Sequence, residues 1–283
     1  MWLTLAIASA LLLGLYDVAK KQALGRNSVL GVLLCATAIS TVLLIPWFRA
    51  GDLRGHLCLL LKAGLVSASW ITGLLALKLL PITTVSTFKT SRPVFVLLFS
   101  ILIYGEKLNA WQWGGSLLTI IAIWMLSRSS KQEGIAFSRS RGVLYMSLAV
   151  LTGVASALWD KHILKFLDPL FVQSWTNLYI TIILAVCLLV QRLSAAPGKY
   201  QGIKWDWMLL VIALLITGAD YLYFRSLHCE GAMLSVISLV RRSSVIVTFA
   251  LGAILFKERN IRSKAAALCV MLLGMILIVI GTA

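Results

Sequence analysis

Two long apolar stretches carry basic residues near their centres, and these stretches decide how the chain folds. Residues 83–104 read TTVSTFKTSRPVFVLLFSILIY, and residues 232–255 read AMLSVISLVRRSSVIVTFALGAIL. Each is long enough to cross a hydrocarbon core about 30 Å thick. A charge at that depth costs about 2.5–3.5 kcal/mol on insertion scales, so it must face other protein groups or a water-filled cavity. The four charges concerned are Lys89, Arg92, Arg241 and Arg242.

Similar apolar runs fill the rest of the chain. Of the 283 residues, 60% are hydrophobic and only 13% are charged, whereas a soluble domain carries roughly 25% charged residues. We therefore predict an all-α, polytopic membrane protein with ten transmembrane helices and no separate soluble domain. The predicted spans are residues 2–19, 28–48, 57–79, 83–104, 110–127, 142–164, 169–190, 206–227, 232–255 and 263–282.

The N-terminal run, residues 1–16, is interpreted as the first span. It lacks a basic start, and Lys20 and Lys21 stand where a signal peptide has its small-residue cleavage site. The five cysteines show no metal or redox spacing, so we expect small buried side chains and no metal or cofactor. The net charge of +16 is spread over short loops instead of one basic face, which argues against a nucleic-acid partner.

Three sequence matches predict that the chain consists of two related halves, residues 1–127 and 142–283, joined by a polar loop at 128–141. Tyr16-Asp17 recurs as Trp159-Asp160, 143 residues later. At an offset of 152, residues 86–91 (STFKTS) align with residues 238–243 (SLVRRS), and Glu106-Lys107 aligns with Glu258-Arg259. Each half holds five spans, an odd number, so the second half must be inverted relative to the first. Inverted repeats are common in transporters and place the binding site near the midplane.

The basic residues in the predicted loops are distributed unevenly. The loops after the odd-numbered spans carry 15 Lys and Arg residues, the opposite side carries seven, and the remaining four are the central ones. The rule that cytoplasmic loops are enriched in positive charge then predicts both termini outside.

The central basic residues favour a site for an anion. Lys89 and Arg92 are three residues apart and share a helix face, and Arg241 occupies the repeat position of Lys89. Guanidinium groups donate forked hydrogen bonds to phosphate and carboxylate. The alternative is an internal ion network, because three aspartates also lie in spans: Asp17, Asp160 and Asp220. Asp17 and Asp160 are retained as candidate site residues.

Aromatic and hydroxyl side chains form a second group of candidates. Tyr16 and Trp159 stand at equivalent repeat positions, which favours a shared place in the cavity wall, and Tyr221 lies beside Asp220. Ser86 and Ser238 are also equivalent and are candidate hydrogen-bond donors, although serine in a membrane helix often serves helix packing.

With these residues placed, the chain resembles the drug/metabolite transporter superfamily, and in particular the EamA family. The likeness rests on Arg92-Pro93-Val94-Phe95, on Gly105-Glu106-Lys107-Leu108, and on Trp113-Gly114-Gly115 in the fifth span. The central charges are similar to those of the sugar-phosphate translocators, which hold phosphate with a lysine in the fourth span and a basic pair in the ninth. Lys89 and Arg241-Arg242 match these positions, while the arginine at 241 and the additional Arg92 depart from them. The resemblance implies cytoplasmic termini, against the charge count.

These observations predict a secondary transporter that moves a small anionic, phosphorylated metabolite by alternating access, in exchange for another solute. The alternatives are an amino-acid or metabolite exporter, with Asp17 or Asp160 completing a mixed-charge site, and a carrier of a phosphorylated lipid headgroup. An intramembrane enzyme would need a general acid or base near the arginines, and only three aspartates are available. We expect no enzymatic activity, a place in a bacterial inner membrane among lipids, and a monomer or homodimer.

Overall fold

The computed structural model describes residues 2–104, 108–135, 137, 139–163, 165–194, 206–227, 229, 237 and 240–281. Within these residues the chain is helical and contains no β-strand, so the predicted all-α class is confirmed. The elements are α1 (Trp2–Ala23), α2 (Val29–Leu43), the 3₁₀ turn η1 (Ile45–Trp47), α3 (Leu53–Leu79), α4 (Ile82–Lys89), α5 (Arg92–Tyr104), α6 (Ala110–Lys131), α7 (Arg141–Ile163), α8 (Pro169–Ser194), α9 (Trp207–Leu227), α11 (Ser244–Leu255) and α12 (Ile261–Ile280).

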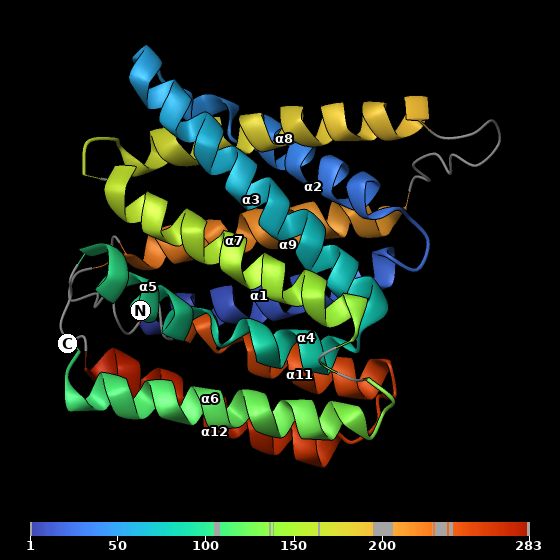
Figure 1. The fold of residues 1–283 in the computed structure, drawn as a ribbon. Coiled ribbons are helices and arrows are strands. Elements are labelled where there is room, and N and C mark those ends of the chain that lie inside the picture. Colours follow the sequence, from blue (N-terminus) through green and yellow to red (C-terminus); the bar gives the residue numbers. More distant parts are fainter. Residues whose placement is uncertain are drawn as a thin grey trace.

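The helices form one bundle whose outer surface is apolar. In the described part of the chain, six helical segments are long and apolar enough to cross a membrane, and Val29–Leu43 and Trp207–Tyr223 are shorter apolar helices. Large aliphatic side chains cover the outside, for example Leu102 and Leu193, which are 78% and 77% exposed. Contiguous exposed apolar surface on this scale fits a lipid environment. The start of α1 and the end of α12 lie at the same end of the bundle (Figure 1).

Several helices begin at side chains that satisfy their free backbone N–H groups. The Ser28 hydroxyl accepts from the amide of Gly31 at 3.1 Å, and the Asp52 carboxylate accepts from Gly55 at 3.1 Å. Asn109 and Gln112 form a capping box at the start of α6, in which each side chain accepts from the other residue's backbone amide.

The paired helices α6 and α12 lie side by side (Figure 1) and approach closely through two glycines. A Cβ atom on Gly115 would lie 2.5 Å from the Gly274 carbonyl oxygen, and one on Gly274 would lie 2.7 Å from the Gly115 oxygen. Small residues allow such contact between membrane helices, whose packing depends on close van der Waals approach. Gly115 of the fifth span and Gly274 of α12 therefore set the close approach of the two helices.

The predicted span 83–104 is two helices, because the chain turns at Thr90 and Ser91 between α4 and α5. Pro93 lacks the amide hydrogen that a continuous helix would use here. The Ser91 hydroxyl donates to the Phe88 carbonyl at 2.6 Å, and the Val94 amide donates to the Ser91 carbonyl at 3.0 Å. The interruption lies between Lys89 and Arg92.

A matching interruption occurs in the ninth span without a proline. Residues 240–242 are helical, Ser243 is a turn, and α11 begins at Ser244. The Ser243 hydroxyl donates to the Val240 carbonyl at 2.6 Å, and the Ile246 amide donates to the Ser243 carbonyl at 2.9 Å. These contacts repeat those of Ser91 at the offset of 152 residues.

Helix ends differ from the predicted ones in ways that affect the charge count. Helix α6 continues to Lys131, so the joining loop is shorter than residues 128–141. Helix α3 begins at Leu53, and Lys62 lies well inside it. Lys264 is fully buried in α12. Both lysines lie within the predicted spans, yet the count of basic residues by side included them; in the structure both are paired with acids inside the bundle.

Candidate functional site

The centre of the bundle is formed by the short helix α4. All of its residues from Ile82 to Phe88 are buried, including three threonines and one serine. It packs against α11, α12 and α6, and more lightly against α7 and α3. A helix that is buried all round has no lipid-facing side, so α4 holds Lys89 at the middle of the protein, with Arg92 just beyond the interruption.

The three in-span aspartates are each ion-paired. Asp17 pairs with Lys20 on α1 at 2.6 Å, and Asp160 on α7 pairs with Lys62 on α3 at 2.7 Å. Asp220 on α9 accepts a hydrogen bond from the Arg241 guanidinium. An internal ion network therefore exists, as the alternative interpretation held, but only Arg241 of the four central basic residues belongs to it.

Lys89, Arg92 and Arg242 remain without a carboxylate within ion-pair distance among the described residues. The Arg92 guanidinium donates to the Gly153 carbonyl of α7. A Cβ atom on Gly153 would lie 2.9 Å from Cζ of Arg92, so the glycine leaves room for this guanidinium. Lys89 and Arg242 have no hydrogen-bond acceptor in the part of the chain that is described. Among the described residues, the half-buried Lys89 and Arg92 and the exposed Arg242 therefore have no carboxylate at ion-pair distance to balance their charge.

These groups lie within electrostatic range of one another. Lys89 lies within this range of Asp17, Lys20 and Arg92, and Arg92 lies within it of Arg242 and Asp160. Tyr16 on α1 interacts with Asp220 on α9, two helices that pack closely. Side chains from α1, α4, α5, α9 and the segment before α11 therefore converge on one region.

The hydroxyl groups of α4 divide into two kinds. The Ser86 hydroxyl donates to the Thr83 carbonyl at 3.1 Å, which is a contact within its own helix. The Thr84 and Thr87 hydroxyls are fully buried and have no hydrogen-bond partner among the described residues. Unsatisfied buried hydroxyls are uncommon in proteins, so these two are better placed than Ser86 to bind a solute. Ser238, the other predicted serine, lies outside the described residues.

The aromatic candidates also differ in where their side chains lie. The Lys20 ammonium lies 3.9 Å from the Tyr16 ring centroid, so Tyr16 lies beside the Asp17–Lys20 ion pair. Tyr221 is 65% exposed on the outside of α9, and the helical period turns Tyr223 inward instead, where its ring lies 4.3 Å from the Arg241 guanidinium. The inclusion of Tyr221 in the site is therefore not supported by the structure.

Trp159 belongs to an apolar cavity of about 710 Å³ between α3, α5 and α7. Its indole N–H donates to the Cys58 carbonyl at 3.0 Å. The α7 side chains that line the cavity form one helical stripe: Leu151, Val154, Ala155, Leu158, Trp159 and His162. Gly153 and Asp160 lie about half a turn away from this stripe. The cavity and the basic centre are thus on opposite sides of α7, and Trp159 does not share the surroundings of Tyr16.

Among the described residues, no three His, Cys, Asp or Glu side chains are grouped so that they would hold a metal ion. The described cysteines are all free thiols. The chemistry of the centre is therefore that of guanidinium, ammonium, carboxylate and hydroxyl groups.

A polytopic helical bundle with a charged, interrupted pair of spans at its centre is the architecture of a membrane transporter. The sequence model of the EamA-like transporter family matches residues 1–128 and 140–280. The chain belongs to this family, and it is a multi-pass integral membrane protein that transports small molecules. The predictions of the family and of a transporter instead of an enzyme are confirmed.

A protein of known crystal structure has a similar fold. It is 14% identical to this chain, and the alignment covers 97% of both chains with a TM-score of 0.62. At that identity the similarity concerns the fold alone. No curated protein matches the sequence.

Proposed function

We propose that this protein is a secondary transporter that moves a small anionic, phosphorylated metabolite by alternating access, in exchange for another solute, across a bacterial inner membrane. The observation that carries the proposal is the surplus of positive charge at the centre. Each aspartate there is paired, while Lys89, Arg92 and Arg242 have no carboxylate partner among the described residues. Because uncompensated charge inside a membrane is costly, an anionic substrate is the partner that these groups require.

A phosphate group suits this arrangement better than a carboxylate does. It presents more oxygens and more charge, and guanidinium groups bind it with forked hydrogen bonds. Helices α5 and α11 begin at Arg92 and Ser244, next to the interruptions, so their positive dipole ends add to the same potential. The buried Thr84 and Thr87 hydroxyls supply further donors.

We further propose that the halves are inverted five-helix repeats, which would rock around this centre. In the proposed repeat, helices α1, α2, α3 and α6 correspond to α7, α8, α9 and α12. When each helix is exchanged for its counterpart, the close pair α3–α7 becomes α9–α1, and the pair α3–α8 becomes α9–α2; all four pairs are in contact. The pairs α6–α12 and α2–α8 map onto themselves. The matching turns at Ser91 and Ser243 support the same relation.

The pairing of the acids also bears on the alternatives. An amino-acid substrate needs a carboxylate for its ammonium group, and Asp17 and Asp160 are both occupied by lysines. A phosphorylated lipid headgroup needs an opening toward lipid that reaches the centre. The apolar cavity, with Leu151 43% exposed, opens outward but lies across α7 from Asp160. A free metabolite is therefore the preferred substrate class.

The test is a thermal-shift screen of the purified protein, because a ligand that binds the folded state stabilises it by mass action. The probes are matched pairs: a hexose phosphate with the free hexose, and phosphoethanolamine with ethanolamine. Amino acids form the third arm. We expect stabilisation by at least one phosphorylated compound and none by its unphosphorylated partner. Stabilisation by amino acids alone would refute the anion proposal and favour the exporter.

A further inference from the structure

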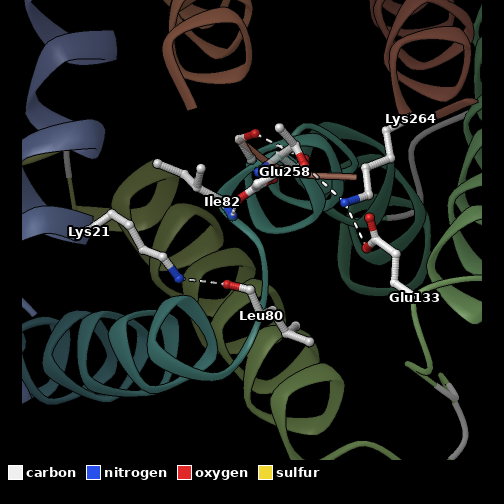
Figure 2. Close-up of polar contacts among 8 residues, drawn as sticks. Lys21, Leu80, Ile82, Glu133, Glu258 and Lys264 are labelled. Atoms are coloured by element: carbon white, nitrogen blue, oxygen red, sulfur yellow. Dashed lines mark hydrogen bonds and ion pairs between the residues drawn. The ribbon is translucent and has the colours of Figure 1, made fainter. Parts of the chain in front are cut away.

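A second set of charged groups lies where α4 and α12 begin, at the end of the bundle opposite the termini (Figure 1), about one helix length from the basic centre along α4. Figure 2 shows the contacts of these groups. Glu258, in the loop between α11 and α12, accepts hydrogen bonds from the first amides of α4: Ile82 at 2.6 Å and Thr83 at 3.1 Å. The Thr83 hydroxyl donates to the same carboxylate. A carboxylate from the second half thus binds the positive end of a helix in the first half.

Lys264 connects this contact to the loop that joins the halves (Figure 2). Its ammonium donates to the Thr83 hydroxyl oxygen at 3.2 Å and pairs with Glu133 at 2.8 Å. The Lys264 side chain is completely buried, and that of Glu133 is 9% exposed. Lys264 lies in the first turn of α12, at the positive end of that helix dipole, and Glu133 follows the end of α6, at the negative end. Each charge is therefore unfavourably placed in the dipole of its own helix. The pair therefore does not serve the stability of either helix.

Further contacts close the same end. The Lys21 ammonium donates to the carbonyls of Leu77 and Leu80 at the end of α3, the latter at 2.8 Å. Gly252 of α11 packs directly against the Ile82 side chain, with no room for a Cβ atom. The contacts at Ile82 and Thr83 join elements of different halves, so this end cannot widen while they are intact.

Among the described residues, the contact at the opposite end of the α6–α12 pair is neutral. Gln112 stands at the repeat position of Lys264, and it forms the neutral capping box with Asn109. The Asn109 amide donates to the Gly281 carbonyl at the end of α12, at 2.7 Å. In the part of the pair that the structure describes, the buried ionic contact between the halves lies at the Lys264 end.

We infer that Glu258, Thr83, Lys264 and Glu133 form a gate, which closes the end of the bundle opposite the termini and must separate when that end opens. This inference rests on the proposed alternating access. Separation is reversible without a chemical step, because each partner regains water when the end opens. The gate is an ionic latch between the halves, and the unpaired centre is the substrate site.

The test measures the width of this end by electron paramagnetic resonance, without a substrate. A chain in which Cys35, Cys58, Cys187, Cys229 and Cys269 are replaced carries spin labels at Lys78→Cys and Arg262→Cys, two exposed positions at this end. We expect one short distance for the otherwise unmodified protein. Glu258→Gln and Thr83→Val should add a longer distance, with the ratio of long to short raised at least tenfold, or about 1.4 kcal/mol.

Gln112→Met is the matched control, since it alters the neutral contact at the other end, and it should not lengthen the distance. If Glu258→Gln fails to fold, Thr83→Val alone decides the question. A folded Thr83→Val protein with an unchanged distance distribution would overturn the gate. Because no substrate is used, a widened end together with a failed phosphate screen would refute the proposed substrate and leave the gate standing.

Discussion

The neighbouring residues Arg241 and Arg242 offer the sharpest test of the distinction between structural and substrate-binding charges. Arg241 makes a charge-assisted hydrogen bond to Asp220, with side chains 21% and 30% exposed, and its guanidinium lies 4.3 Å from the Tyr223 ring centroid. The hydrogen bond is worth about 1.5–3 kcal/mol and the cation–π contact about 0.5–1 kcal/mol. Arg241→Ala should therefore lower the free energy of unfolding by about 2–4 kcal/mol.

Arg242→Ala should behave in the opposite way. Arg242 has no ion-paired carboxylate among the described residues, so its loss should change stability by no more than about 0.5 kcal/mol. Removing one guanidinium from a bound, desolvated anion costs about 2–4 kcal/mol. The affinity should then fall at least tenfold, because each 1.4 kcal/mol is a factor of ten.

Both quantities are measured on the same purified variants. Unfolding is followed by the melting temperature, and affinity by calorimetric titration with the phosphorylated compound that gives the largest thermal shift. Arg128→Ala, at the end of α6, is the control and should change neither. If Arg242→Ala melts at a much lower temperature and the surviving folded protein binds normally, Arg242 is structural. The unpaired basic residues would then not form a substrate site.

Two further predictions use glycines with matched neighbours. Gly153→Ala should weaken anion binding several-fold at nearly unchanged melting temperature, because its Cβ would lie 2.9 Å from Cζ of Arg92 and displace that guanidinium. The control is Gly64→Ala, whose Cβ would have no atom within 4 Å, and it should leave the affinity in the same titration unchanged. Gly115→Ala should lower the melting temperature clearly, because its Cβ would lie 2.5 Å from a backbone carbonyl of α12, while Gly114→Ala, whose nearest neighbour is 3.9 Å away, should not; equal melting temperatures for these two variants would contradict the close packing.

Spacing along the sequence could not pair the charges. Span length and the cost of a buried charge predicted that Lys89, Arg92, Arg241 and Arg242 lie inside the bundle, and in the structure the first three are half-buried while Arg242 is exposed. The partner of Asp160 is Lys62, which is nearly 100 residues away in sequence and lies on another helix. Ion pairs between different helices depend on helix rotation and packing, and neither can be read from the spacing of residues along one helix.

The interruptions were not predicted, because residues 83–104 and 232–255 were each taken as one continuous span. Pro93 marks a break in any helix, but the ninth span has no proline and turns at Ser243 all the same. The sequence match of STFKTS with SLVRRS suggested equivalent positions, and the backbone contacts of Ser91 and Ser243 explain that equivalence. Tyr221 was chosen because it is adjacent to Asp220 in sequence, but its side chain is exposed on the outside of α9. The tyrosine of α9 that faces inward is Tyr223, two residues further on.

The composition of α4 connects the gate with the site. The sequence ITTVSTFK is too polar to face lipid, and the helix is buried on every side, so it can lie only inside the bundle. It has eight residues, which makes it about 12 Å long. Its first amides are held by Glu258 from the other half, and its last residue is Lys89. A short helix moves as a rigid unit, so release of Glu258 would shift Lys89 relative to Arg242. Opening the gate and loosening the grip on the anion are then one movement, and Thr83→Val should alter both the distance distribution and the affinity for the phosphorylated compound.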